Sequence, residues 1–276
     1  MEQLQEINFI SLLLVASIIT GLGAGIIAGL FGVGGGVIIV PALLLLFHLT
    51  ELPTTHIMQM AVGTSLATII ITNLMATFKQ QRRKSINWLA VGYYTPGVLC
   101  GAWLGAQIAV RLEGELLQLL FGIFLLTVAI KMIKSGEDKK QDNKPIRLQR
   151  LSSTIISLII GALSSLFGIG GGSLSVPALT LISHIPIRVA VGSSSAIGIF
   201  LAISGAAGFI NAGWNKPDLP TGSWGYILPE AFFGIIIGTL ITTPIGVKLA
   251  HTLPPAKLRK SFGVFLLLVG IKLMIG

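Results

Sequence analysis

Residues 31–43 read FGVGGGVIIVPAL, and residues 167–179, about half a chain later, read FGIGGGSLSVPAL. The two stretches share a glycine triplet and a Val-Pro pair, and most of their other residues are identical or similar. Three further matches follow in the same order: 61–65 with 190–194, 96–105 with 229–238, and 121–133 with 262–274. Matching segments in a constant order indicate that the chain is a tandem duplication.

The composition of this duplicated chain predicts that it lies in a lipid bilayer. Hydrophobic residues make up 53% of the sequence, charged residues 11%, and the mean hydropathy is +0.88. A soluble domain has about 25% charged residues, and apolar stretches near the ~20 residues that span a bilayer recur throughout. We therefore expect an all-α, polytopic membrane protein without a nucleic-acid partner. The single cysteine, Cys100, excludes a disulfide framework.

Each copy contains about five apolar segments. They cover residues 9–31, 37–49, 57–78, 88–110 and 115–133, then 151–169, 173–184, 188–210, 224–250 and 258–275. Because five is an odd number, the second copy is expected to cross the membrane in the opposite sense. The predicted organisation is a first repeat at 1–135, a cytoplasmic linker at 136–150 and an inverted second repeat at 151–276.

The positions of lysine and arginine predict the orientation, because cytoplasmic loops are enriched in both. The loop at 79–84 is basic, whereas its counterpart at 211–223 holds only Lys216. In the inverted arrangement only Arg111, Lys216 and Lys272 lie outside. We expect a multi-pass protein of the plasma or inner membrane, with residues 79–87, 134–150 and 251–257 cytoplasmic and both termini external.

The second segment of each copy is short for a full crossing. Two arrangements stay open: eight spanning helices with two re-entrant pairs, or ten crossing segments. Both give the same placement of the loops.

The glycine triplets predict helix breaks at membrane depth. Glycine favours departure from helical geometry, and a proline disfavours it in the residue before. A new half-helix should begin between Gly35 and Pro41, and free N–H groups at such a start favour anions. The candidate site residues at the breaks are Gly34, Gly35, Gly36, Pro41, Gly170, Gly171, Gly172 and Pro177. The alternative is that the glycines only allow close helix crossing.

Hydroxyl groups are concentrated in the second copy, where serines replace Val37 and Ile39 of the first. The candidates are Thr64, Ser65, Ser173, Ser175, Ser193 and Ser194. Hydroxyls and N–H groups can hold an anion without a buried cation. The alternative is that each hydroxyl bonds to a carbonyl of its own helix.

The pattern GxGGGxxxVP in both halves, with AVG(T/S)S after it, resembles the sulfite exporter TauE/SafE family of membrane permeases. The resemblance covers nearly the whole chain. It implies transport of sulfite, sulfonates, sulfoacetate or related anions, and leaves the particular anion open.

Three residues are candidates for proton coupling. Glu230 is the only carboxylate inside an apolar segment, about 9 Å below Trp224 if the intervening residues are helical. Such residues are often functional, although a tilted helix would return Glu230 to the headgroups. His48 and His184 follow the two prolines at the same spacing. Each either binds and releases a proton in a step coupled to substrate binding, or caps the carbonyl groups of its helix.

The sequence thus predicts a secondary transporter for a small sulfur-containing anion, acting by alternating access around the paired breaks. HExxH, Walker A and CxxC motifs are absent from the sequence, so we expect neither an enzyme nor a cofactor or metal site. An anion channel and a subunit without transport of its own stay as alternatives, and the oligomeric state stays open. Export is favoured, because a potential that is negative inside drives anions outward.

Overall fold

The computed structural model describes residues 2–31, 35–50, 52, 54–134, 148–252 and 255–275. In these residues the regular structure is helical, apart from one isolated bridge between Trp224 and Ile227. The helices are α1 (Glu2–Phe31), α2 (Gly36–Leu49), α3 (Ile57–Arg82), α4 (Trp88–Ala109), α5 (Gly114–Lys134), α6 (Arg150–Leu166), α7 (Gly172–Leu181), α8 (Ile187–Gly213), α9 (Pro229–Thr252) and α10 (Pro255–Ile275). The all-helical prediction is confirmed, and the helices follow the predicted apolar segments in order.

Both glycine triplets interrupt helices, as predicted. In the first half, α1 ends at Phe31 and α2 begins at Gly36; in the second, α6 ends at Leu166 and α7 begins at Gly172. The intervening residues 32–34 lie outside the described part of the chain. Pro41 and Pro177 lie inside α2 and α7.

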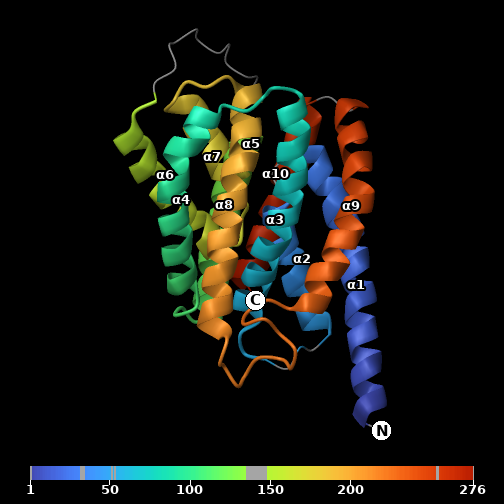
Figure 1. Cartoon of the computed structure of the whole chain (residues 1–276). Helices are drawn as coiled ribbons and strands as arrows, with labels where there is room; N and C mark the ends of the chain where they lie inside the picture. The colour runs from blue at the N-terminus through green and yellow to red at the C-terminus, as the bar shows by residue number, and fades with distance from the viewer. Residues whose placement is uncertain are drawn as a thin grey trace.

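The helices pair across the two halves of the chain (Figure 1). The outer pairs are α1 with α9 and α6 with α4, while α5 packs on α10 and α3 packs on α8. Each helix of the first half therefore has its main partner in the second half, apart from the short α2, which packs on α3 and α1.

Glycines bring the outer helices close together, as expected within lipid. A Cβ atom at Gly21 of α1 would lie 2.6 Å from the carbonyl oxygen of Ile235 in α9. In the other pair, a Cβ at Gly161 of α6 would lie 2.7 Å from the carbonyl oxygen of Val98 in α4. Backbone atoms cannot yield this space, so glycine is required at both contacts.

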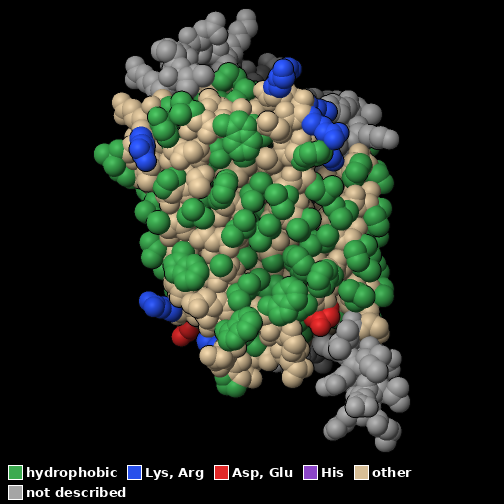
Figure 2. All heavy atoms as spheres, viewed as in Figure 1, with side chains coloured by type: hydrophobic (Ala, Val, Ile, Leu, Met, Phe, Trp, Pro, Cys, Tyr) green, Lys and Arg blue, Asp and Glu red, His purple; other side chains and the backbone are tan. Residues whose placement is uncertain are grey.

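The exterior is apolar, as a bilayer requires. Among the residues that the structure describes, three helical stretches are long and apolar enough to cross a membrane: α3, α8 and Pro229–Gly246 of α9. Shorter apolar helices accompany them in the described residues. Figure 2 shows hydrophobic side chains covering the side of the molecule between two ends that carry the charged groups. The chain is a helical membrane protein.

The two ends differ in charge. Exposed cations at the ends of α3, α6, α8 and α10 lie at one end: Lys79, Arg82, Arg83, Lys84, Arg150, Arg188 and Lys260. The opposite end carries Arg111, Lys216 and Lys272 together with Glu113, Glu115, Asp218 and Glu230. Most of the predicted linker, residues 135–147, lies outside the described residues.

One predicted boundary is wrong, because α9 begins at Pro229 rather than near 224. The chain turns first, with Gly225 at a φ of +57° and the Trp224 N–H donating to the Ile227 carbonyl at 2.9 Å. Proline then suits the first helical position. Glu230 consequently lies in the first turn of α9. The expected depth of about 9 Å below Trp224 is wrong, because it assumed that the residues between them are helical.

Candidate substrate site

The second break forms a glycine loop between α6 and α7. Gly168 has a φ of +65°, which side-chain-bearing residues rarely adopt. The Ile169 N–H turns back to the Ser164 carbonyl at 2.8 Å. Helix α7 then starts at Gly172, and the first N–H groups of a helix have no partner within it. Such a start favours an anion.

The first break packs directly against the second. Gly35, with a φ of +81°, precedes α2. A Cβ atom at Gly36 would lie 2.6 Å from the Gly168 carbonyl oxygen and 2.9 Å from the Gly170 nitrogen. The Ser65 hydroxyl of α3 donates to the same Gly168 carbonyl at 2.8 Å. The two breaks are therefore in backbone contact, and a side-chain hydrogen bond joins the second break to α3.

Four serines of the second half are buried and have hydroxyl oxygens without a hydrogen-bond partner in the described residues: Ser164, Ser165, Ser175 and Ser194. The first two close α6, the third lies in the first turn of α7, and the last lies in α8. A buried, unpaired polar group costs about 1–3 kcal/mol. Several of them in one region indicate a place where a ligand or water supplies the missing partner.

Ser175 and Ser194 lie close to an amide side chain from α3. A Cβ at Gly171 would lie 3.0 Å from the Ser175 hydroxyl and 3.8 Å from the Gly198 Cα, and a Cβ at Gly198 would meet the Asn73 side-chain nitrogen. Ser194 precedes Gly198 by one turn of α8, on the same face. We call Asn73, Gly171, Ser175, Ser194 and Gly198 the second-break cluster; it offers neutral hydrogen-bond donors.

Two predicted hydroxyls are instead engaged in backbone contacts. Thr64 of α3 accepts a hydrogen bond from the Leu228 N–H at 3.0 Å, just before α9. Ser193 of α8 accepts one from the Asn87 N–H at 2.8 Å, just before α4. We call these the Thr64 latch and the Ser193 latch. Each connects the third helix of one half to the entrance of the fourth helix of the other.

The remaining predicted break residues lie apart from the cluster or cannot be placed. Pro41 lines a separate cavity between α1, α2 and α10. Pro177 is half-buried within α7. Gly34 and the side chain of Ser173 lie outside the described residues.

The three candidates for proton coupling are not brought together. His48 is exposed and its Nδ1 contacts the Leu44 carbonyl at 2.7 Å within α2. His184 follows α7 in a left-handed conformation, with a φ of +53°. Glu230 is half-buried, and its Oε2 has no hydrogen-bond partner in the described residues.

Sequence reasoning missed Ser164, Ser165 and Asn73. The two serines align with Ala28 and Gly29 of the first copy. Ser175 was selected because a serine replaces an apolar residue of the first copy, and the same comparison would have identified both serines. Asn73 is an amide inside a long apolar helix and is 5% exposed. Its polarity at that position was a usable signal.

Comparison with known proteins defines the relationship of the chain. The family model described as sulfite exporter TauE/SafE matches residues 17–273. The chain belongs to this family. A probable membrane transporter protein of Haemophilus influenzae is 36% identical over 258 residues, which cover 94% of this chain and 97% of the relative. Another, of Methanocaldococcus jannaschii, is 30% identical over 279 residues and covers 98% of both chains.

The expected resemblance is therefore confirmed for the sulfite exporter TauE/SafE family. Membership identifies the chain as one of a family of membrane transporters. No solved structure matches it.

Proposed function

We propose that the chain is a secondary transporter, not an enzyme, that moves a small sulfur-containing anion such as sulfite, thiosulfate or an organosulfonate. We assign the anion to the second-break cluster. The N–H groups at the start of α7 and the hydroxyls of Ser175 and Ser194 are its donors. The supporting observation is that these buried hydroxyls have no partner in the described residues. Anion oxygens accept several neutral hydrogen bonds without a buried cation.

Access to this site alternates by rocking of two inverted repeats, at 1–135 and 151–276, joined by a linker at 136–150. Reciprocal contacts support this arrangement. A Cβ at Gly63 would meet the Tyr226 carbonyl oxygen at 2.7 Å, and a Cβ at Gly192 would meet the Ser85 carbonyl oxygen. One residue further along α3 and α8, the Thr64 and Ser193 latches connect the same helices to the segments just before α9 and α4. Each latch closes one side of the pathway.

The protein lies in the cell membrane with its basic end in the cytoplasm and both termini outside. The exposed cations gathered at one end support this orientation (Figure 2). In a Cys100→Ala background, single cysteines at Arg83 and Lys216 should react with an impermeant reagent from opposite sides of the membrane. Reaction from the same side would contradict the inverted arrangement.

Transport runs outward. A potential of about 100 mV, negative inside, contributes about 2.3 kcal/mol per charge moved across, so anion export needs no coupling cation. Uptake would need one, for which Glu230, His48 and His184 are the candidates; Glu230 is half-buried, and its Oε2 has no hydrogen-bond partner in the described residues. Glu230→Gln should leave potential-driven flux intact. Loss of pH-driven accumulation in this variant, with potential-driven flux unchanged, would instead show proton-coupled uptake.

Flux in proteoliposomes tests the substrate and the class of protein together. We expect sulfite, thiosulfate, sulfoacetate or taurine to be carried in preference to sulfate and neutral thiols, with saturation and counter-transport. Flux that neither saturates nor shows counter-transport would indicate an anion channel. Absence of flux for the whole panel would indicate a subunit without transport of its own.

A further inference from the structure

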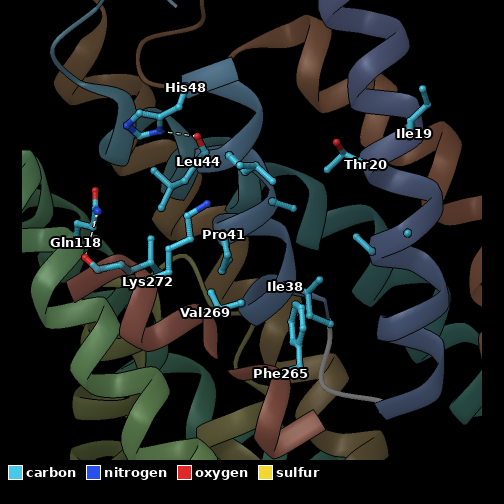
Figure 3. A pocket seen from close by; sticks show the side chains of 15 residues that line it. Ile19, Thr20, Ile38, Pro41, Leu44, His48, Gln118, Phe265, Val269 and Lys272 are labelled. Atoms are coloured by element: carbon cyan, nitrogen blue, oxygen red, sulfur yellow. Dashed lines mark hydrogen bonds between the residues drawn. The ribbon is translucent and has the colours of Figure 1, made fainter. Parts of the chain in front are cut away.

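A cavity of about 560 Å³, separate from the second-break cluster, lies between α1, α2 and α10, with α5 at one end. We call it the α1/α2/α10 cavity. Its walls are mainly apolar and its polar side chains are few (Figure 3). Exposed side chains of Ile19 and Leu45 are among its lining. It therefore opens onto the apolar exterior of the helix bundle, where the bilayer lies.

Polarity changes along this cavity. His48, Gln118 and Lys272 lie near the ends of α2, α5 and α10, whereas Ile38 and Phe265 line the opposite end (Figure 3). Gln118 donates to the Leu273 carbonyl at 3.1 Å and so fixes α5 against α10 at this point. One end of the cavity is suited to a polar group and the other to a hydrocarbon chain.

Lys272 provides an unbalanced charge at the polar end. Its ammonium group points across the cavity toward Pro41 of α2 (Figure 3). The cavity lining includes no aspartate or glutamate, and no ion pair joins Lys272 to a carboxylate in the part of the chain that the structure describes. The sequence favours a lysine that extends to the membrane surface, and the exposed Lys272 side chain lines the polar end of the cavity.

We propose that the α1/α2/α10 cavity binds one anionic phospholipid, with its phosphate at Lys272 and an acyl chain along Ile38 and Phe265. The volume is within the range of about 300–1,000 Å³ that is usual for ligand pockets. A phosphate supplies the missing negative charge, and an acyl chain fills the apolar end. This site is separate from the second-break cluster and does not depend on which anion is transported.

Native mass spectrometry of the full-length protein, with phosphatidylglycerol and phosphatidylcholine of identical acyl chains, tests the assignment. A lysine near the membrane surface favours an anionic lipid by about fivefold, so the wild-type protein should retain phosphatidylglycerol with about that preference. Lys272→Gln should abolish the preference. Arg111→Gln is the matched control, because Arg111 is an exposed cation at the same end but outside the cavity.

A second variant tests the acyl-chain end. Gly23 lines the cavity, and a Cβ there would meet nothing within 4 Å. Gly23→Phe should reduce retention of both lipids by filling the space, in a variant whose thermal unfolding midpoint in detergent matches that of the wild type. Equal retention of the two lipids by the wild-type protein, or an unchanged preference in Lys272→Gln, would overturn the proposal. Displacement of phosphatidylglycerol by sulfite would also overturn it, since the cavity would then belong to the substrate pathway.

Discussion

The two glycine breaks have the same sequence pattern but different surroundings. At the first, Val37, Ile38 and Ile39 are buried hydrophobic residues, and Gly36 is in backbone contact with the second break. At the second, Ser175 takes the place of Ile39 and joins other buried hydroxyls without partners. A duplicated motif has thus become a packing joint in one copy and a polar site in the other. Substitutions within the two breaks should therefore have different consequences.

The largest difference is expected between Gly36→Ala and Gly171→Ala. At Gly36 the new methyl group meets backbone atoms of Gly168 and Gly170, whereas at Gly171 it meets the ends of the Ser175 and Leu201 side chains, at 3.0 and 3.3 Å. Overpacking against backbone costs about 1–3 kcal/mol. Gly36→Ala should lower the thermal unfolding midpoint in detergent. Gly171→Ala should stay folded and lose transport, because its methyl group occupies the second-break cluster.

Gly92→Ala is the control for the helix propensity of alanine, since a Cβ there meets nothing within 4 Å. Equal losses of stability in Gly36→Ala and Gly171→Ala would show that the first break does not differ from the second in its role in packing.

Substitutions in the two latches should open the pathway to opposite sides of the membrane. Thr64→Val leaves the buried Leu228 N–H unpaired, at a cost of about 1–3 kcal/mol, and Ser193→Ala leaves the part-buried Asn87 N–H unpaired, at the lower end of that range. If each latch closes one side, Thr64→Val should increase labelling of a Ser175→Cys reporter from the Lys216 side in a Cys100→Ala background. Ser193→Ala should increase it from the opposite side.

Thr72→Val is the matched control for the latches, because the Thr72 hydroxyl bonds to the Ile69 carbonyl of its own helix. Increased labelling from the same side in both latch variants would argue against two opposed gates.

A smaller effect is expected at the hydroxyls of the second-break cluster. Ser175→Ala and Ser194→Ala should each raise the apparent KM for the transported anion by about fivefold, since a lost hydrogen bond is worth about 1 kcal/mol. Their thermal midpoints should not fall, because each substitution removes an unpaired buried hydroxyl. Ser195→Ala is the control, since that hydroxyl already bonds to the Val191 carbonyl. A loss of stability without a change in KM would assign both serines to packing.

Much of the fold follows from the sequence, because hydropathy and duplication act over long segments. The order of the helices and both breaks agree with the apolar segments and glycine triplets, although α9 begins later than expected. Contacts between distant residues do not follow in this way. Thr64, Ser65 and Ser175 looked alike as hydroxyls, yet Thr64 accepts from Leu228, Ser65 donates to Gly168, and Ser175 has no partner in the described residues. Such roles depend on packing between the halves, which neither composition nor spacing specifies.

The start of α9 is a second feature that the sequence pattern does not predict. Residues 224–228 are apolar apart from Gly225, and hydropathy alone extends the helix through them. The chain instead forms a turn that positions Tyr226 and Leu228 against α3. The tertiary contact overrides the local pattern.

The smallest expected effect is a pH dependence confined to one latch. His56 lies just before α3, with its ring centroid 5.5 Å from that of Tyr226, and the Lys216 Nζ lies 5.6 Å from the same Tyr226 ring. Burial lowers the pKa of His56, the positive charge of Lys216 lowers it further, and Asp218 partly opposes both. The contact therefore favours neutral His56.

Acid should consequently weaken the contacts near the Thr64 latch. Above an unfolded-state pKa of about 6.5, His56 is neutral in both states and contributes no pH dependence. As the pH falls through that value, the unfolded chain binds the proton more readily than the folded one, so stability decreases. The segment at 83–87 that forms the Ser193 latch contains no histidine, and acid should leave this latch unchanged.

The thermal unfolding midpoint of the wild-type protein should fall between about pH 7.5 and about pH 5.5, and it should fall less in His56→Gln. Lys216→Gln should have an intermediate slope, because burial, the larger cause, remains. An equal slope in wild type and His56→Gln would show that this histidine does not couple pH to the latch.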